Sequence, residues 1–522
     1  MYRKYLLLIV LFAVSAAAQD EKKSSWLEAL KYKVELQTTN SCGDNTPLWL
    51  NANKFGLSSL DKNNGYARGS LIRPLRTDSG FKWGVGYGVD VAVPYNFTSN
   101  VVVQQAFVEG RWLHGILSIG SKEYPAEMKN NELSSGGQAV GINARPVPQV
   151  RIALSDYWTL PFTGGWFHVK GHIAYGKMTD DKWQHSFTNR KSKYADDVLY
   201  HSKNCFFKIG NEERFFPVSF EIGLDMAAEF GGTGYVFNKD GTVTAYKGRK
   251  WLKGMWDAFS GEGSDANETV YKNVSGNILG SWLVRLTYDT DDWRFSLYAD
   301  KFFEDHSALV QMDYDGYGKG DEWDVRKKDR YLLYDFKDWL LGVELNLKNG
   351  RWLRDLVLEY MYTRYQSGPV YHDHSPNISD HISGRDNYYN HGIYTGWQHW
   401  GQVMGNPLYL SPIYNKDGTI YCYNNRFLAF HLGFSGNPTE RLHYRVLATY
   451  QKSYGTYDYP YKKVYRNFYF LTEAGYSFGG KMEGWNVTGG LAMDFGKDRG
   501  NNQGLQITVS KSGILNFKHS KK

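Results

Sequence analysis

The chain has 522 residues, a net charge of +7 and an aromatic content of 16%, and its mean hydropathy is −0.52. So many aromatic rings exclude an intrinsically disordered chain, because disordered chains are poor in them. Three cysteines without a C-x-x-C pair argue against a disulfide framework and against a structural zinc site. The positive charges form no dense block among the aromatic residues, so we expect no nucleic-acid partner.

The first 18 residues have the pattern of a secretory signal peptide. Arg3 and Lys4 precede an apolar run over residues 5–14, and three alanines at 16–18 provide a cleavage site. The apolar run is shorter than the roughly 20 residues of a membrane-spanning helix. We therefore predict that residues 1–18 are removed and that the mature chain begins near residue 19.

Residues 19–60 are less regular than the rest of the chain. The stretch "SWLEALKYKVELQ" predicts a short helix that leads into a strand. We treat 19–60 as a separate N-terminal segment, which is either a first strand or a plug, and 61–522 as one domain.

A strand followed by a turn recurs through residues 61–522. In Trp339–Leu347 apolar residues occupy every second position, Asn349-Gly350 turns the chain, and residues 356–362 alternate again. Residues 282–299, 428–450 and 485–510 repeat this pattern. The chain is therefore predicted to be all-β and antiparallel.

Three features favour a membrane barrel over a soluble sandwich. The opposite strand faces carry Arg, Glu, Lys, Asn and Gly, aromatic residues lie near strand ends, and short turns alternate with long inserts. All three are typical of transmembrane β-barrels. We predict an outer-membrane barrel of about 16–18 strands. Because alternation alone also fits a secreted soluble β-protein, that alternative stays open.

The sequence holds no recognisable catalytic motif, and we expect neither enzymatic activity nor a cofactor. Two loops contain metal-binding residue types: His372, His374, Asp380 and His381 in one, and Asp313, Asp315, Asp321 and Glu322 in the other. The first would suit Zn or Cu and the second Ca²⁺. Neither has the spacing of a known site, so no metal site is predicted.

One segment, "GRDNYYNHGIYTGWQHWGQVMGNPLYLSP" (384–412), is rich in rings and hydrogen-bonding groups but poor in aliphatic residues. Flat rings can stack on the apolar faces of sugars, while charged groups bind their hydroxyls. The predicted polysaccharide-binding residues are Arg385, Asp386, Tyr389, Trp397, His399 and Trp400. The alternative is that these rings belong to an interfacial girdle or pack a loop onto a barrel rim.

The segment "GRDNYYNHGIYTGWQHWGQVMGNPL" resembles a signature of the Wzi-type capsule assembly proteins. "KFFEDHSALVQMDYDGYGKGDEW" (301–323) and "GINARPVPQVRIALSDY" (141–157) are similar to further segments of that family. The resemblance implies an outer-membrane barrel of about eighteen strands that retains capsular polysaccharide, without catalysis, cofactor or metal. Distant members of the family carry an N-terminal helical bundle, whereas this sequence predicts at most one short helix in that region.

From the residues and the resemblance together we expect an outer-membrane lectin that binds capsular or other surface polysaccharide and supports capsule assembly. Its other expected partners are outer-membrane lipid and lipopolysaccharide, and we expect a monomer. The alternative function is an outer-membrane porin or transporter channel, which would conduct ions through an open lumen.

Overall fold

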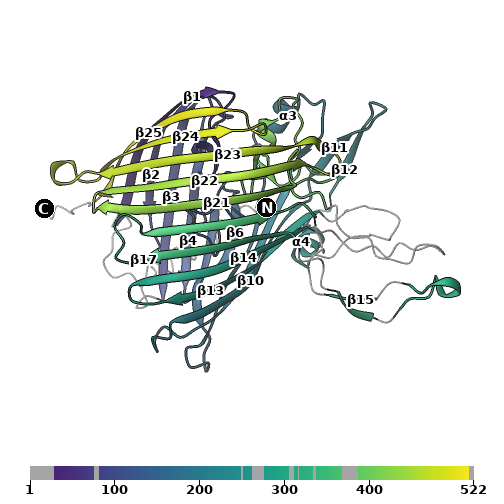
Figure 1. Ribbon diagram of the computed structural model, residues 1–522, viewed down its shortest axis with the longest axis horizontal. Coiled ribbons are helices and arrows are strands. Elements are labelled where there is room, and N and C mark those ends of the chain that lie inside the picture. Colours follow the sequence, from purple (N-terminus) through teal and green to yellow (C-terminus); the bar gives the residue numbers. More distant parts are fainter. Residues whose placement is uncertain are drawn as a thin grey trace, which may run out of the picture.

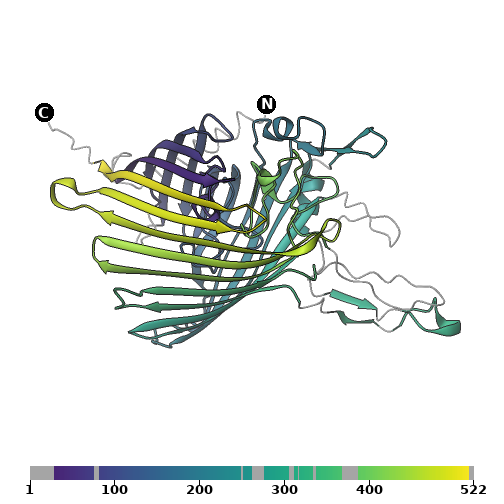
Figure 2. The ribbon, with the colours of Figure 1, turned by 45° about the horizontal axis from the view of Figure 1, so that its top comes forward.

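The structure is a computed structural model that describes residues 29–75, 82–248, 251–260, 276–304, 311–314, 317–327, 329–332, 337–366 and 386–515. Its main element is an 18-stranded antiparallel sheet that closes on itself, because β1 pairs with both β2 and β25. Figure 2 shows β1 beside the C-terminal strands. The prediction of an all-β transmembrane barrel is confirmed.

The barrel strands follow one another around the wall in chain order (Figure 1). They are β1 (Leu30–Gly43), β2 (Asn63–Arg73), β3 (Trp83–Tyr95), β4 (Val102–Trp112), β5 (Gly115–Ser121), β6 (Gln149–Thr159), β7 (Phe167–Lys177), β9 (Leu199–Ile209), β10 (Val218–Phe230), β13 (Asn277–Asp289), β14 (Trp293–Glu304), β17 (Trp339–Leu347), β18 (Asp355–Tyr362), β21 (Phe427–Thr439), β22 (Leu442–Gly455), β23 (Pro460–Ser477), β24 (Trp485–Phe495) and β25 (Asn502–Leu515).

Smaller elements lie in the long connections. Three short sheets are formed by β8 (Tyr194–Asp196) with β11 (Thr233–Phe237) and β12 (Val243–Lys247), by β15 (Gln311–Tyr314) with β16 (Asp329–Leu332), and by β19 (Gln398–His399) with β20 (Gln402–Val403). The helices are α2 (Leu48–Asn51), α3 (Trp183–Thr188) and α4 (Trp251–Ser260), with 3-10 turns η1 (Gly320–Glu322), η2 (Pro412–Tyr414) and η3 (Gly480–Met482). Among the helices in the described ranges, none is long and apolar enough to cross a membrane.

The two strand faces differ in polarity, as the alternating pattern predicts. In the middle of β1, Leu36 points outward and is 59% exposed, whereas its neighbours Glu35 and Gln37 are buried in the lumen. The same holds on β17, where Leu341 is exposed and Leu340 is buried. An apolar outer belt with polar residues inside is the surface that a bilayer requires.

The two ends of the barrel can be told apart by their connections. Residues 113–114, 290–292 and 440–441 form short turns at one end, where β1 begins and β25 ends. The long connections that follow β7, β10 and β18 leave the barrel at the other end, which is therefore the external one. At the short-turn end Trp83 stacks on Trp112 with ring centroids 5.9 Å apart, as in an interfacial aromatic girdle.

The N-terminal boundary differs from the prediction. The barrel begins with β1 at Leu30 and not at residue 61, which agrees with the option of a first strand in 19–60, and α2 and the residues after it turn into the lumen as a plug segment would. The backbone N–H of Leu48 in α2 donates to Asp494 Oδ2 on β24 over 2.9 Å. Alternation in 30–43 is visible in the sequence, but only its pairing with β25 assigns it to the barrel. The predicted signal peptide, 1–18, lies outside the described residues.

Candidate functional site

The candidate functional site is the lumen, which two external inserts enter. The first, residues 122–148 between β5 and β6, is tied to the wall by ion pairs. Lys122 Nζ lies 2.5 Å from Glu109 Oε2, Glu127 lies 2.7 Å from Lys170, and Lys129 Nζ lies 3.3 Å from Asp300 Oδ2. Because irregular backbone at membrane depth needs internal partners, this polar wall is what lets the insert lie inside the barrel.

The wall also binds the backbone of this first insert. Glu359 on β18 accepts from the Ser134 hydroxyl over 2.7 Å and from the Ser135 N–H over 2.8 Å. Asp300 accepts from the N–H of Gln138 over 3.3 Å. The insert is therefore held at several points along its length.

The second insert, residues 386–426, packs on the first one. The Trp397 indole N–H donates to Ala139 O over 2.7 Å, and Asn406 Nδ2 donates to Ser135 Oγ over 3.0 Å. Asn143 Nδ2 donates to Val403 O over 2.8 Å. Together the two inserts and α2 form a plug, which shares one buried cluster with the wall.

Rings from this second insert form the centre of the plug. Tyr389 stacks on Tyr409 with centroids 3.9 Å apart, and Phe302 of β14 meets Tyr388 edge-on at 4.8 Å. Gly405 is required here, because a Cβ at that position would lie 2.0 Å from the Tyr389 hydroxyl. The aromatic richness of 384–412 therefore serves an internal core.

The structure buries three of the six predicted polysaccharide-binding residues. Trp397 is 0% exposed, and Tyr389 and His399 are each 2% exposed. Trp400 and Asp386 are half-buried, and Arg385 lies outside the described residues. The structure thus gathers Tyr389, Trp397, His399 and Trp400 in the plug, where the first two present no face to an external polymer.

Two cavities flank the plug. The external one, ≈ 490 Å³, is bordered by Asp180, His185, Asp196, His399 and Trp400. The internal one, ≈ 70 Å³, is bordered by Lys122, Tyr124, Arg145, Gln149 and Tyr200, among others. Sequence reasoning named His399 and Trp400 but missed the other residues of this site, because they come from inserts far apart along the chain.

Arg145 and Trp400 stand between the two cavities. Arg145 borders the internal cavity, and its guanidinium carbon lies 4.1 Å from the ring centroid of Trp400, which borders the external one. The guanidinium also donates to Ser99 Oγ and Thr98 Oγ1, each over 2.9 Å. Burial lowers the pKa of Arg145 to about 10, so the group is charged at neutral pH.

His399 joins this pair to the external cavity. Its Nδ1 lies 2.8 Å from Arg145 O, and its Nε2 lies 2.6 Å from Thr179 O and 3.2 Å from the Thr179 nitrogen. A neutral imidazole can donate to only one of the two carbonyl oxygens. Burial lowers the pKa of His399 to about 4, so the ring is neutral at pH 7.

No group of three or more His, Cys, Asp or Glu suited to a metal ion occurs within the described ranges. His372, His374, Asp380, His381 and Asp315 lie outside those ranges, as does the side chain of Asp313. Asp321 and Glu322 belong to η1 and are not buried.

Comparison with family models and with curated proteins gives no match. Among solved structures, the chain is similar to OccD3 (OpdP) of Pseudomonas aeruginosa, with 8% identity, 95% of this chain and 93% of that chain covered, and a TM-score of 0.45. It is also similar to OprD of Pseudomonas aeruginosa, with 9% identity, coverage of 94% and 96%, and a TM-score of 0.43. OccAB4 of Acinetobacter baumannii matches with 9% identity, coverage of 94% and 99%, and a TM-score of 0.41.

The expected function as a capsule lectin is wrong. The similar structures are of the OprD/Occ type, and at 8–9% identity they share the barrel fold with this chain. Of the rings on which the lectin interpretation depended, Tyr389, Trp397 and His399 are buried in the plug, and Trp400 is half-buried. Membership of the Wzi-type family stays a prediction, because none of these comparisons bears on it.

Proposed function

We propose that the protein is an outer-membrane channel for small polar solutes, with a path that passes beside the plug at Arg145 and Trp400. The observation that carries this proposal is that these two contacting side chains separate two neighbouring cavities. The path would run from the external cavity past Trp400 and Arg145 to the charged inner wall.

The wall below the internal cavity has the chemistry of a solvated passage. Arg151 on β6 lies with its guanidinium carbon 3.9 Å from the Tyr124 ring centroid, and Lys122 borders the cavity itself. Lys170 on β7 continues the row of cations, with Glu127 as its partner. Charged groups in a lumen are costly when dry and are tolerated where water reaches them.

The plug sets the width of this passage. At its centre the aromatic cluster leaves no exposed surface on Tyr388, Trp397 or Tyr409. Solutes would therefore have to pass at its edge, where side chains can move without dismantling the cluster.

The test is ion conductance in planar bilayers. We expect the purified protein to give small, discrete current steps, and Arg145→Ala with Trp400→Ala to enlarge them at least twofold, because both large side chains leave the narrowest point. The control is Trp256→Ala, which removes an exposed ring of α4 outside the barrel and should leave the step size unchanged. If neither the wild-type protein nor the double variant conducts, the channel proposal is wrong.

We also propose that residues 1–18 are cleaved on secretion and that the mature chain acts as a monomer without enzymatic activity, cofactor or nucleic acid. The N-terminal pattern of a basic start, an apolar run and three alanines supports the cleavage. The mass of the protein purified from the outer membrane tests it. An intact mass that includes residues 1–18 would contradict this.

A further inference from the structure

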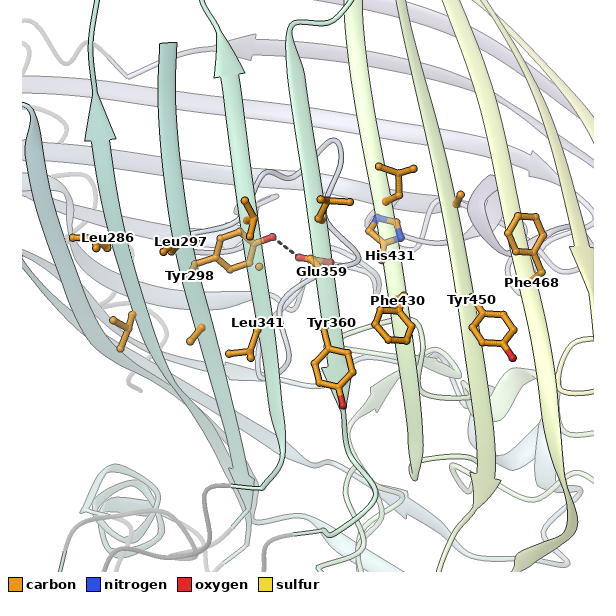
Figure 3. A pocket seen from close by; sticks show the side chains of 17 residues that line it. Leu286, Leu297, Tyr298, Leu341, Glu359, Tyr360, Phe430, His431, Tyr450 and Phe468 are labelled. Carbon is orange, nitrogen blue, oxygen red and sulfur yellow. Dashed lines mark hydrogen bonds between the residues drawn. The ribbon is translucent and has the colours of Figure 1, made fainter.

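The outer face of the barrel carries a depression of ≈ 800 Å³ in its apolar belt. It extends across the wall from β13 to β23, and outward side chains border it (Figure 3). They include Leu286, Leu297, Leu341, Tyr360, Phe430 and Phe468. Because protein and lipid surfaces pack without voids, something must fill this depression in the membrane.

Contacts on the inner side of the wall hold the depression in shape. Behind it the Tyr298 hydroxyl donates to Glu359 Oε1 over 2.6 Å, which Figure 3 shows as a dashed line. His431 Nε2 donates to Leu133 O of the plug over 2.8 Å. The first bond ties β14 to β18, and the second ties β21 to the plug.

Two glycines allow the close packing on the inner side of the wall, because each leaves room for a neighbouring atom. A Cβ on Gly342 would lie 2.0 Å from Cζ of Tyr298, and one on Gly433 would lie 2.3 Å from Leu133 O. Side chains at these positions would push the wall outward. The depression is therefore built into the fold and does not depend on mobile surface groups.

Two cations lie directly above the depression, on its external side. Phe430, Tyr450 and Phe468 are paired neighbours on β21, β22 and β23. Two residues further toward the external end, the same strands place Leu428, Lys452 and Arg466 in one row. Two residues of strand span about 7 Å. Lys452 Nζ lies 6.0 Å from the Tyr450 ring centroid, which confirms that it points outward too.

Neither cation is neutralised by a carboxylate in the part of the chain that the structure describes. Lys462, which is exposed on the same strand as Arg466, adds a third positive charge nearby. Cations on an outward face near the external membrane surface attract anionic groups of the external leaflet. An Arg guanidinium binds phosphate through two parallel hydrogen bonds, and a Lys ammonium binds it as a point charge.

We propose that this face binds a phosphorylated glycolipid of the external leaflet, of the lipid A type. Its acyl chains fill the depression, and a phosphate group lies on Lys452 and Arg466. A zwitterionic lipid would bring a cation of its own to this positive row. A second copy of the barrel would bring two positive rows together, because a twofold axis along the membrane normal keeps both at the same height.

The test uses the full-length barrel in detergent, with lipid A as the probe and native mass spectrometry as the readout. We expect one lipid A per barrel and at least tenfold weaker binding by Lys452→Glu with Arg466→Glu. Ala448→Trp should weaken it similarly by filling the depression, which Ala448 borders. Lys239→Glu with Lys247→Glu is the matched control, since it makes the same charge change on exposed residues in and next to β12, away from the depression.

Three outcomes would overturn the proposal. They are undiminished binding by the Lys452/Arg466 variant, equal binding of lipid A from which the phosphates have been removed, and barrel dimers that disappear with Ala448→Trp. The substituted residues all lie outside the lumen, so the variants should conduct like the wild-type protein. Their conductance reports correct folding, and a non-conducting wild-type protein would contradict the channel without affecting lipid binding.

Discussion

Single side chains fix the plug through buried hydrogen bonds, and His399 makes two of them. The neutral ring bridges Arg145 and Thr179, two residues from different inserts. Protonation would add a positive charge to a buried ring beside the Arg145 guanidinium, and both burial and that neighbouring cation disfavour it. His391 in the same insert is neutral too, because burial lowers its pKa to about 3.

Acid should therefore loosen the second insert. The pKa of His399 falls from 6.5 to about 4 on burial, so between these values the loosened form binds a proton that the packed form does not. Stability of the packed insert thus decreases as the pH falls through this range. The hydrogen-exchange protection of residues 397–404, corrected for the intrinsic pH dependence of amide exchange, should be lower at pH 4.5 than at pH 7, and this difference should be smaller in His399→Gln. Equal protection at both pH values in the wild-type protein would contradict this.

The backbone of Gly342 on β17 lies directly against the ring of Tyr298 on β14. Gly342→Val would force Tyr298 aside and break its bond to Glu359. Overpacking of this kind costs about 1–3 kcal/mol. Urea unfolding in detergent should show this loss. The control is Gly489→Val on β24, where a Cβ meets nothing within 4 Å; an equal loss there would mean that strand glycines in general, and not this contact, are responsible.

At the scale of elements, the first insert behaves as an inner layer of the wall. Its partners come from β4, β7, β14 and β18, so it links strands that do not pair with one another. Its most buried link is Lys129 with Asp300, whose side chains are each 1% exposed. Such a pair contributes little net stability, but removing one partner leaves a buried charge.

Asp300→Asn should therefore destabilise the protein by about 3–5 kcal/mol, because the Lys129 ammonium stays buried without its counter-charge. The same substitution in the exposed pair of Lys177 and Asp197, Asp197→Asn, should cost less than about 1 kcal/mol. Denaturant titrations of both variants provide the measurement. Similar costs at the two sites would show that the buried pair does not anchor the insert.

At the scale of the whole molecule, the apolar belt and the closed sheet place the barrel in a bilayer. Leu36 lies at the middle of β1 and faces outward. Leu36→Arg should reduce the free energy of folding into lipid vesicles by about 2–4 kcal/mol, as for a cation at the bilayer midplane. Phe162→Arg is the matched control, since Phe162 is fully exposed in the turn 160–166 and lies near the interface. Equal costs at both positions would contradict a bilayer around β1.

Much of the fold could be predicted from the sequence because the signals are local. The side chains of a strand alternate between lipid and lumen, so Leu340 and Leu341 report their faces without knowledge of any partner. The turn at Asn349-Gly350 and the alternation on either side likewise correspond to β17 and β18. The fold class, the antiparallel order of the strands and the upper limit of the predicted number of strands can be read from such repeats.

The site could not be predicted in the same way, because its contacts are not local. Asn406 and Ser135 bind each other across 271 positions of the chain, and Tyr389 depends on Gln138. The composition of a ring-rich insert is the same whether the insert projects outward to a sugar or folds inward onto another insert. Only the tertiary structure, by giving those rings buried partners, decided that residues 386–426 fold into the lumen, while the sequence by itself determined the alternating wall around them.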